Sequence, residues 1–192
     1  DTFEATSALD QHFQDLLSAG FSTTASKNLV VIGGGFTGLE VITSLPQRVK
    51  ICAPGETGFN FFLVERSTTL ASNYSSNAQE YIMNQLKISD IQVLLGEEAE
   101  RIEIGKIILK TGKSIESNTV IWTTGLAASP LAASLKGRRD ELGRLCVDPF
   151  LRLPTDHNVF AAGDVAKVKV DDQNDSVMSC QHAIPQGKIA GH

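Results

Sequence analysis

The alternation of apolar and polar positions along this 192-residue chain predicts a fold in which strands and helices follow one another. Short apolar runs rich in β-branched and aromatic residues are typical of buried strands, whereas apolar residues spaced three and four apart are typical of one helix face. The runs predict strands over residues 29–32, 59–65, 91–95, 101–104, 106–110, 119–125 and 158–162. The spacing predicts helices over residues 7–19, 37–45, 75–87 and 177–191.

Polar and proline-containing stretches suggest where these elements end. Residues 22–26 are expected to form a polar linker. Because proline lacks an N–H donor and disfavours helical geometry just before itself, Pro46 is expected to stop the second helix. The apolar segment 49–52 can then form a short strand. Pro185 is expected to interrupt the last helix for the same reason.

The order of the expected elements indicates an α/β protein. Strand, helix, strand, helix and strand in succession are typical of a mostly parallel sheet with crossover helices. The two short strands after it, with turns at Gly105 and at residues 111–113, predict an antiparallel β-meander before a closing strand. After Gly125 the chain becomes loop-rich.

The first predicted strand ends at glycines with GxGxxG spacing, which are Gly33, Gly35 and Gly38. In a dinucleotide-binding site the first glycine lets the chain turn sharply, the second lets the backbone approach the diphosphate, and the third lets the helix pack closely on the strand. The helix start then offers free N–H groups and the positive end of the helix dipole to the phosphates. Gly34, Phe36 and Thr37 complete the set of expected cofactor-binding residues in this bend. The alternative is a glycine-rich loop that binds no ligand.

An acidic residue, Glu65, ends the second apolar strand. An acid at this place accepts hydrogen bonds from the adenosine ribose and repels a 2′-phosphate, which favours NAD over NADP. Glu65 follows Gly33 at more than the usual spacing of ~20 residues, and the segment 46–58 accounts for the excess. Arg66 follows directly, so NADP stays open, and Glu65 can also be read as a solvated strand end.

Composition narrows the class of partner. The formal net charge of −5 without a long basic run argues against nucleic acid. No apolar run approaches the ~18–20 residues that cross a bilayer, and the first residues do not resemble a signal peptide. The sparse cysteines Cys52, Cys146 and Cys180 suggest free thiols in a reducing, cytoplasmic compartment. The scattered histidines make a metal site unexpected.

Three motifs in a fixed order carry a family resemblance. They are residues 30–40, residues 120–125 and residues 158–166, followed by Gln-Gly-Lys at 186–188. With these motifs the sequence resembles the FAD/NAD(P)-dependent pyridine nucleotide oxidoreductases, which are flavoproteins with two dinucleotide-binding domains. Within them it is most similar to type II NADH dehydrogenases.

The resemblance implies a FAD-binding domain that an NAD-binding domain interrupts. By analogy residues 1–26 are a linker helix from the FAD-binding domain. Residues 27–125 are a Rossmann-like NAD(H)-binding domain with a parallel sheet and a β-meander. Residues 126–192 are the C-terminal part of the FAD-binding domain. The implied cofactors are FAD and NAD.

The resemblance also implies roles for individual residues in the C-terminal part. Gly163 and Asp164 would approach the ribityl–phosphate portion of the flavin, with Asp164 accepting a hydrogen bond from a ribityl hydroxyl. Gln181 and His182 would lie at a helix N-terminus that faces the flavin ring and stabilises negative charge on it. Read alone, His182 is equally a surface or core histidine.

Three further residues join the expected cofactor contacts. Glu40 would face the nicotinamide side, although an acid in a first helical turn is also favoured by the dipole alone. Thr124 and Gly125 end the second motif. No side chain is expected to serve as a catalytic acid or base, because the cofactors supply the chemistry.

The sequence departs from the family pattern by carrying one glycine-rich fingerprint, the one that matches the NAD-binding domain. The chain is therefore expected to be a fragment that lacks the FAD-binding fingerprint and the membrane-docking segment, so peripheral membrane contact belongs only to the parent protein. Strands without neighbours predict mobility or a homodimer contact in residues 126–192. The expected function is hydride transfer from NADH through FAD to a quinone or another acceptor. The alternatives are an NAD(H)-binding module without flavin and an inactive truncated fragment.

Overall fold

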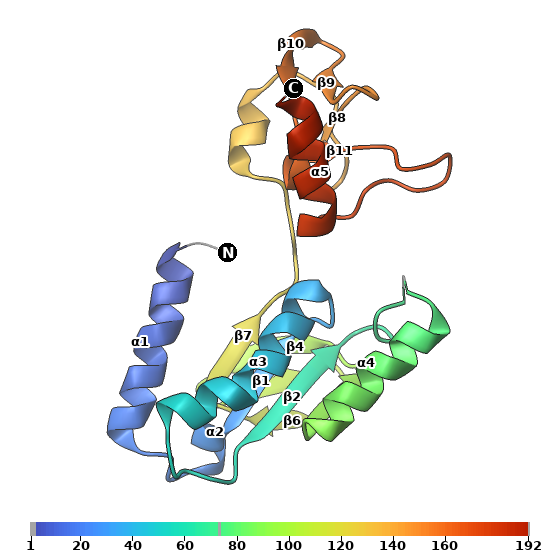
Figure 1. Ribbon diagram of the computed structural model, residues 1–192. Coiled ribbons are helices and arrows are strands. Elements are labelled where there is room, and N and C mark those ends of the chain that lie inside the picture. The colour runs from blue at the N-terminus through green and yellow to red at the C-terminus, as the bar shows by residue number, and fades with distance from the viewer. Residues whose placement is uncertain (1–2, 73, 192) are drawn as a thin grey trace. The chain divides into compact units, whose positions relative to one another are not determined.

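A four-stranded parallel sheet forms the centre of the first of two units into which the chain divides, Asp1–Thr124 and Gly125–His192 (Figure 1). The structure is a computed structural model that describes residues 3–72 and 74–191. The sheet has the order β3-β2-β1-β7, and each neighbouring pair is parallel. Its strands are β1 (Asn28–Ile32), β2 (Asn60–Glu65), β3 (Ile91–Leu95) and β7 (Thr119–Trp122).

Helices cover one face of this sheet and an antiparallel meander covers the other (Figure 1). Leu29 and Val31 of β1 pack in a cluster with residues of the helices, whereas Val30 and Ile32 pack in a second cluster with the meander. Because these strands are buried on both faces, their sequences are continuous runs of apolar residues. The helices are α1 (Phe3–Ala19), α3 (Phe36–Cys52) and α4 (Ser76–Ile88), and the meander is β4 (Ala99–Glu103), β5 (Lys106–Leu109) and β6 (Ser114–Glu116). The predicted α/β class with a parallel sheet and a meander is confirmed.

The prediction that a proline ends the second helix is wrong, because α3 continues through Pro46 to Cys52. A proline in a helix interior costs ~3 kcal/mol through the lost hydrogen bond and the clash with the preceding turn. Buried Ile42, Leu45 and Val49 continue one apolar face across this position, and their packing on the sheet outweighs that cost. The segment 49–52 is therefore the last turn of α3 and not a strand.

Two smaller predictions also fail. Residues 22–26 are not a plain linker, because they include the start of a short helix, α2 (Thr24–Lys27). A capping box between Thr23 and Ser26 caps the N-terminus of this helix. The last helix, α5 (Cys180–Ala190), is not interrupted at Pro185. Pro185 lies in its second turn, where the chain loses one hydrogen bond and remains helical.

The second unit consists of short paired segments around a small apolar core. Strand β10 (Asp156–Phe160) pairs antiparallel with β9 (Arg152–Leu153), and β11 (Ala166–Lys167) pairs parallel with β8 (Leu145–Cys146). Two 3₁₀ turns, η1 (Pro130–Ser134) and η2 (Gly163–Val165), and helix α5 complete the unit. Its core contains Ala132, Leu145, Leu153, Ala161 and Ala166.

Two turns of this unit share one construction. Asp140 accepts hydrogen bonds from the backbone N–H and the Nε of Arg144, and Asp148 accepts the same pair from Arg152. In each turn the residue before the arginine has a positive φ, which is 79° at Gly143 and 65° at Leu151. Charge-assisted hydrogen bonds of this kind compensate the backbone strain at the leucine.

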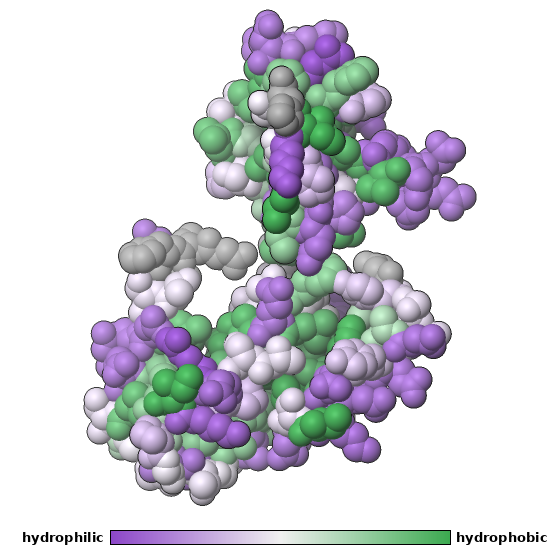
Figure 2. Space-filling view, in the orientation of Figure 1, coloured by the Kyte–Doolittle hydropathy of each residue, from purple (hydrophilic) through white to green (hydrophobic). Residues whose placement is uncertain are grey.

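The segment between β11 and α5 projects as a polar excursion. Figure 2 shows mostly hydrophilic residues over it, and a mixture of hydrophobic and hydrophilic residues elsewhere on the visible face of the second unit. Lys167 forms an ion pair of 3.0 Å with Asp175 across its base, and Asp171 accepts hydrogen bonds from the N–H groups of Gln173 and Asn174 at its tip. Several large apolar side chains of this unit are more than half exposed, namely Leu131, Phe150, Val170, Ile184 and Ile189.

Candidate functional site

The candidate site lies at the edge of the central sheet where the parallel strands end. Because β1, β2 and β7 run in the same direction, their carboxyl ends meet at one edge, with β1 between the other two. The backbone N–H of Gly33 donates to the carbonyl of Val64 at 2.8 Å, and the N–H of Thr123 donates to the carbonyl of Ile32 at 2.9 Å. Hydrogen bonds to β2 on one side and to the residue after β7 on the other thus fix the bend after β1.

Three glycines of this bend, Gly33, Gly34 and Gly38, lie where a side chain has no room. Gly33 has a φ of 108°, in the region that favours glycine. A Cβ built on Gly38 would overlap the carbonyl oxygen of Gly33, and one built on Gly34 would overlap the side chain of Leu70. The start of α3 therefore packs directly on the backbone of the bend.

Gly35 differs from its neighbours because it faces open space. Within residues 3–72 and 74–191, no atom lies within 4 Å of a Cβ built on Gly35, apart from its chain neighbours. Gly35 is also the N-cap of the 17-residue helix α3, and no hydrogen bond from a side chain caps it in the described part of the chain. The N–H groups of the first turn, at Phe36 and Thr37, are therefore available to an anion.

Glu65 at the end of β2 reaches the glycine bend. Its Oε2 accepts a hydrogen bond of 2.6 Å from the N–H of Gly34, and its Oε1 accepts one of 2.8 Å from the N–H of Ser67. Partial burial alone would raise the pKa of Glu65. The hydrogen bonds from Ser67 and Gly34 and the charge of Arg66 outweigh burial and hold the pKa below its ordinary value of 4.5.

This lowered pKa predicts how stability depends on pH. The folded-state pKa of Glu65 lies below the unfolded value, so its contribution is fully present above about pH 4.5 and is lost as pH falls through the lower, folded value. Thermal unfolding between pH 6 and pH 3 should therefore show a smaller acid-induced loss of stability in Glu65→Gln than in the parent chain. Equal losses in the two proteins would contradict this role of the Glu65 carboxylate.

An open cleft of about 190 Å³ connects these groups. The cleft is lined by the glycine bend with the start of α3, by the end of β2 and by the loop before α4. The rings of Phe36 and Tyr74 meet edge to face at 5.5 Å on its rim. The lining residues are Gly34, Gly35, Phe36, Leu39, Glu65, Ser67, Thr69, Ala71, Ser72 and Tyr74.

Two other predicted residues of the first unit lie near the bend. Glu40 is exposed on the second turn of α3. Thr124 is exposed two residues beyond the end of β7, and its methyl group occupies the place into which a Cβ of Gly33 would project. Gly125 begins the second unit with a φ of 85°.

The remaining predicted residues come together within the second unit. Gly163 and Asp164 form η2, and Gln181 and His182 lie in the first turn of α5. A Cβ on Gly163 would lie 3.2 Å from that of Ala183, so the turn and the helix are in close contact. Asp164 is exposed, and the ring Nδ1 of His182 lies 3.0 Å from the Ser179 hydroxyl.

Two residues that support these segments, Thr123 and Gln186, belong to the motifs named above, but neither could be assigned a role from the sequence. The Thr123 hydroxyl donates to the carbonyl of Ile32 at 2.8 Å, and the buried side chain of Gln186 accepts a hydrogen bond of 2.7 Å from the N–H of Gly163. A hydroxyl directly after a strand and a glutamine next to a glycine in a helix are weak signals. Their partners lie 91 and 23 positions away, so only the fold reveals them.

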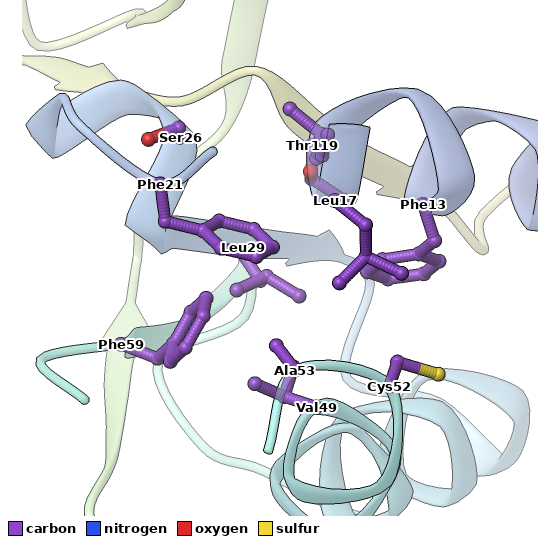
Figure 3. A pocket seen from close by; sticks show the side chains of 11 residues that line it. Phe13, Leu17, Phe21, Ser26, Leu29, Val49, Cys52, Ala53, Phe59 and Thr119 are labelled. Carbon is purple, nitrogen blue, oxygen red and sulfur yellow. The ribbon is translucent and has the colours of Figure 1, made fainter. Parts of the chain in front are cut away.

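A second pocket, shown in Figure 3, lies inside the apolar core between α1, β1 and the end of α3. The side chains of Phe13, Leu17, Phe21 and Phe59 point into it. Its volume of about 10 Å³ is at the lower limit for one water molecule. It is a packing gap and not a substrate site.

Among residues 3–72 and 74–191, no group of three or more His, Cys, Asp or Glu side chains could hold a metal ion. The same part of the chain contains no helix with the length and apolar character that crossing a membrane requires. Cys52, Cys146 and Cys180 are free thiols.

A parallel sheet with a glycine bend, an adjoining helix N-terminus and an acid on the neighbouring strand defines a dinucleotide-binding fold of the Rossmann type. The pyridine nucleotide-disulphide oxidoreductase family model matches residues 1–187, and the chain belongs to this family. The family resemblance inferred from the motifs is confirmed.

Named relatives agree with the family. A NADH dehydrogenase-like protein of Mycobacterium tuberculosis is 35% identical over 193 residues, covering 100% of this chain and 48% of the relative. A type II NADH:quinone oxidoreductase of Haemophilus influenzae is 25% identical over 146 residues, covering 72% of this chain and 33% of the relative. The chain thus spans about half or less of the length of these relatives.

A solved structure shares the fold. A FAD-dependent pyridine nucleotide-disulphide oxidoreductase from Desulfovibrio vulgaris superposes with a TM-score of 0.71 at 23% identity, covering 95% of this chain and 45% of that one. At this identity the likeness concerns the fold.

Proposed function

We propose that the chain binds NADH at the glycine bend and is part of a FAD-dependent NADH:acceptor oxidoreductase. The observation that carries the proposal is the open approach to Gly35 beside the uncapped start of α3, with Glu65 on the next strand. The diphosphate would lie against the N–H groups of the first helical turn, and the adenosine ribose near Glu65. A side chain at position 35 would fill the free space in which the diphosphate is proposed to lie.

A role for FAD is supported in the second unit. Exposed Asp164, in a turn packed on the start of α5, would accept a hydrogen bond from a ribityl hydroxyl. The N-terminus of α5, with Gln181 and His182 in its first turn, would stabilise negative charge. FAD, when bound, would accept the hydride that NADH donates. No side chain of this chain needs to act as an acid or base.

The division of the chain follows from this proposal. Residues 1–26 are assigned as a linker helix, residues 27–125 as the NAD(H)-binding domain and residues 126–192 as part of a FAD-binding domain. The boundary between the two units after Thr124 supports this assignment. Because the type II relative is named a NADH:quinone oxidoreductase, a quinone is the proposed electron acceptor. The free cysteines fit a cytoplasmic location.

A second candidate function is that of an NAD(H)-binding module without flavin. The first unit carries the whole glycine bend and the cleft, whereas the described strands of the second unit form only two-stranded pairs. The exposed apolar side chains of the second unit would then make a homodimer contact or receive another segment.

One experiment distinguishes these functions. The purified chain is titrated with NADH by calorimetry, and its visible spectrum is recorded before and after addition of FAD and removal of the unbound excess. Heat of NADH binding together with retained flavin absorbance supports the oxidoreductase, and NADH binding without retained flavin supports the module. Absence of NADH binding would overturn both.

A prediction about cofactor choice follows from the proposed place of the adenosine ribose near Glu65. Glu65→Ala removes the carboxylate that repels a 2′-phosphate and keeps the neighbouring Arg66. We expect the preference for NADH over NADPH to fall about tenfold, equivalent to ~1.4 kcal/mol. The measurement is the ratio of the two dissociation constants, with Glu56→Ala as a control, because Glu56 forms an exposed ion pair with Lys27 outside the cleft. An unchanged ratio in Glu65→Ala would remove this role for Glu65.

A further inference from the structure

Thr123 lies directly after β7, at the carboxyl edge of the sheet, and its hydroxyl contacts the backbone of the glycine bend. The hydroxyl donates to the carbonyl of Ile32 at 2.8 Å and lies 3.2 Å from the carbonyl oxygen of Gly33. The N–H of Thr123 donates to the same Ile32 carbonyl at 2.9 Å. Two successive carbonyls of the bend are therefore turned toward β7.

The same hydroxyl also fills the space beneath the two constrained glycines. The Thr123 Oγ1 would lie 3.0 Å from a Cβ built on Gly33 and 2.8 Å from a Cβ built on Gly38. Thr123 is half-buried, so its polar group needs a partner, and the bend supplies it. The side chain is thus packed between the end of β1 and the first turn of α3.

We propose that Thr123 is a positioning residue for the dinucleotide diphosphate. The N–H groups of Gly33 and Gly34 already donate to Val64 and Glu65. By holding the Gly33 carbonyl, against which Gly38 packs, the Thr123 hydroxyl fixes the first turn of α3. The N–H groups of that turn, at Phe36 and Thr37, lie beside the open side at Gly35. A preformed set of donors binds an anion without the entropic cost of ordering the donors during binding. This inference rests on the proposed binding of NADH at the bend.

The chain provides a matched control at the other end of the same two strands. The Ser117 hydroxyl, just before β7, donates to the carbonyl of Asn28 at 2.7 Å and lies 2.8 Å from that of Thr119. Ser117 is buried. Each hydroxyl thus joins the β7 side of the sheet to a carbonyl of β1, but only Thr123 does so at the glycine bend.

The test compares Thr123→Val, Thr123→Ser and Ser117→Ala with the parent chain, using calorimetry with NADH and thermal unfolding. Thr123→Val keeps the shape and removes the hydroxyl, and we expect its dissociation constant for NADH to rise at least fivefold. Thr123→Ser keeps the hydroxyl and should stay within twofold of the parent. Ser117→Ala should lower the unfolding temperature without changing the dissociation constant by more than twofold.

The outcomes separate this inference from the proposed function. Parent-like NADH affinity in Thr123→Val, or an equal loss in Thr123→Ser or in Ser117→Ala, would overturn the positioning role. If Thr123→Val does not fold, Thr123→Ala replaces it with the same expectation. If the parent chain itself does not bind NADH, the proposed function fails first, and the inference fails with it.

Discussion

Gly35→Ala is expected to leave the chain folded and to weaken NADH binding at least tenfold, or by about 1.4 kcal/mol. Within the described residues a Cβ at Gly35 meets no atom closer than 4 Å, apart from its chain neighbours. Its φ of −72° and ψ of −178° suit any residue. The added methyl group would therefore meet no packed neighbour but would project into the space proposed for the diphosphate. Calorimetry with NADH and thermal unfolding measure the two effects separately.

Gly187→Ala is the matched control for this prediction. Gly187 lies in α5, and a Cβ there also meets no atom within 4 Å in the described part of the chain. The substitution should leave the NADH dissociation constant unchanged, since Gly187 is not among the residues that line the cleft. A Gly35→Ala variant that binds NADH as tightly as the parent chain would show that no ligand approaches the bend at this residue.

The central sheet could be predicted from the sequence because its signal is local. Strands buried on both faces need apolar residues at every position, and the runs at 29–32, 59–65 and 91–95 match β1, β2 and β3 within one residue at each end. The position of the glycine bend followed from the same run. Gly33 could be predicted to adopt an unusual backbone because the strand ends there.

Other features of the site could not be predicted, because they depend on segments far apart in the sequence. The hydrogen bond from the Gly34 N–H to Glu65 spans 31 positions, and that from the Thr123 hydroxyl to Ile32 spans 91. The register of the parallel strands determines which residues become partners, and no local sequence pattern predicts that register. Glu65 could be placed at a strand end, but its contact with the bend could not.

The predictions that Pro46 ends one helix and that Pro185 interrupts another are wrong for a related reason. A proline acts locally, whereas the apolar face that continues past Pro46 acts through the sheet on which it packs. The sequence does show Ile42, Leu45 and Val49 at helical spacing across the proline. That spacing, unlike the proline, agrees with the observed end of the helix at Cys52.

Gly38→Ala is expected to destabilise the first unit by about 3 kcal/mol or to prevent its folding. A Cβ at Gly38 would overlap the carbonyl oxygen of Gly33, which is backbone and is held by the bend, so either α3 or β1 must shift. Intrinsic helix propensity acts in the opposite direction, since alanine is favoured over glycine by ~1 kcal/mol within a helix. Denaturant unfolding followed by circular dichroism measures the balance, with Gly187→Ala as the variant in which propensity acts alone. If Gly38→Ala proved as stable as Gly187→Ala, the close packing of α3 on the glycine bend would not be a requirement of the fold, and the role given to the third glycine would be wrong.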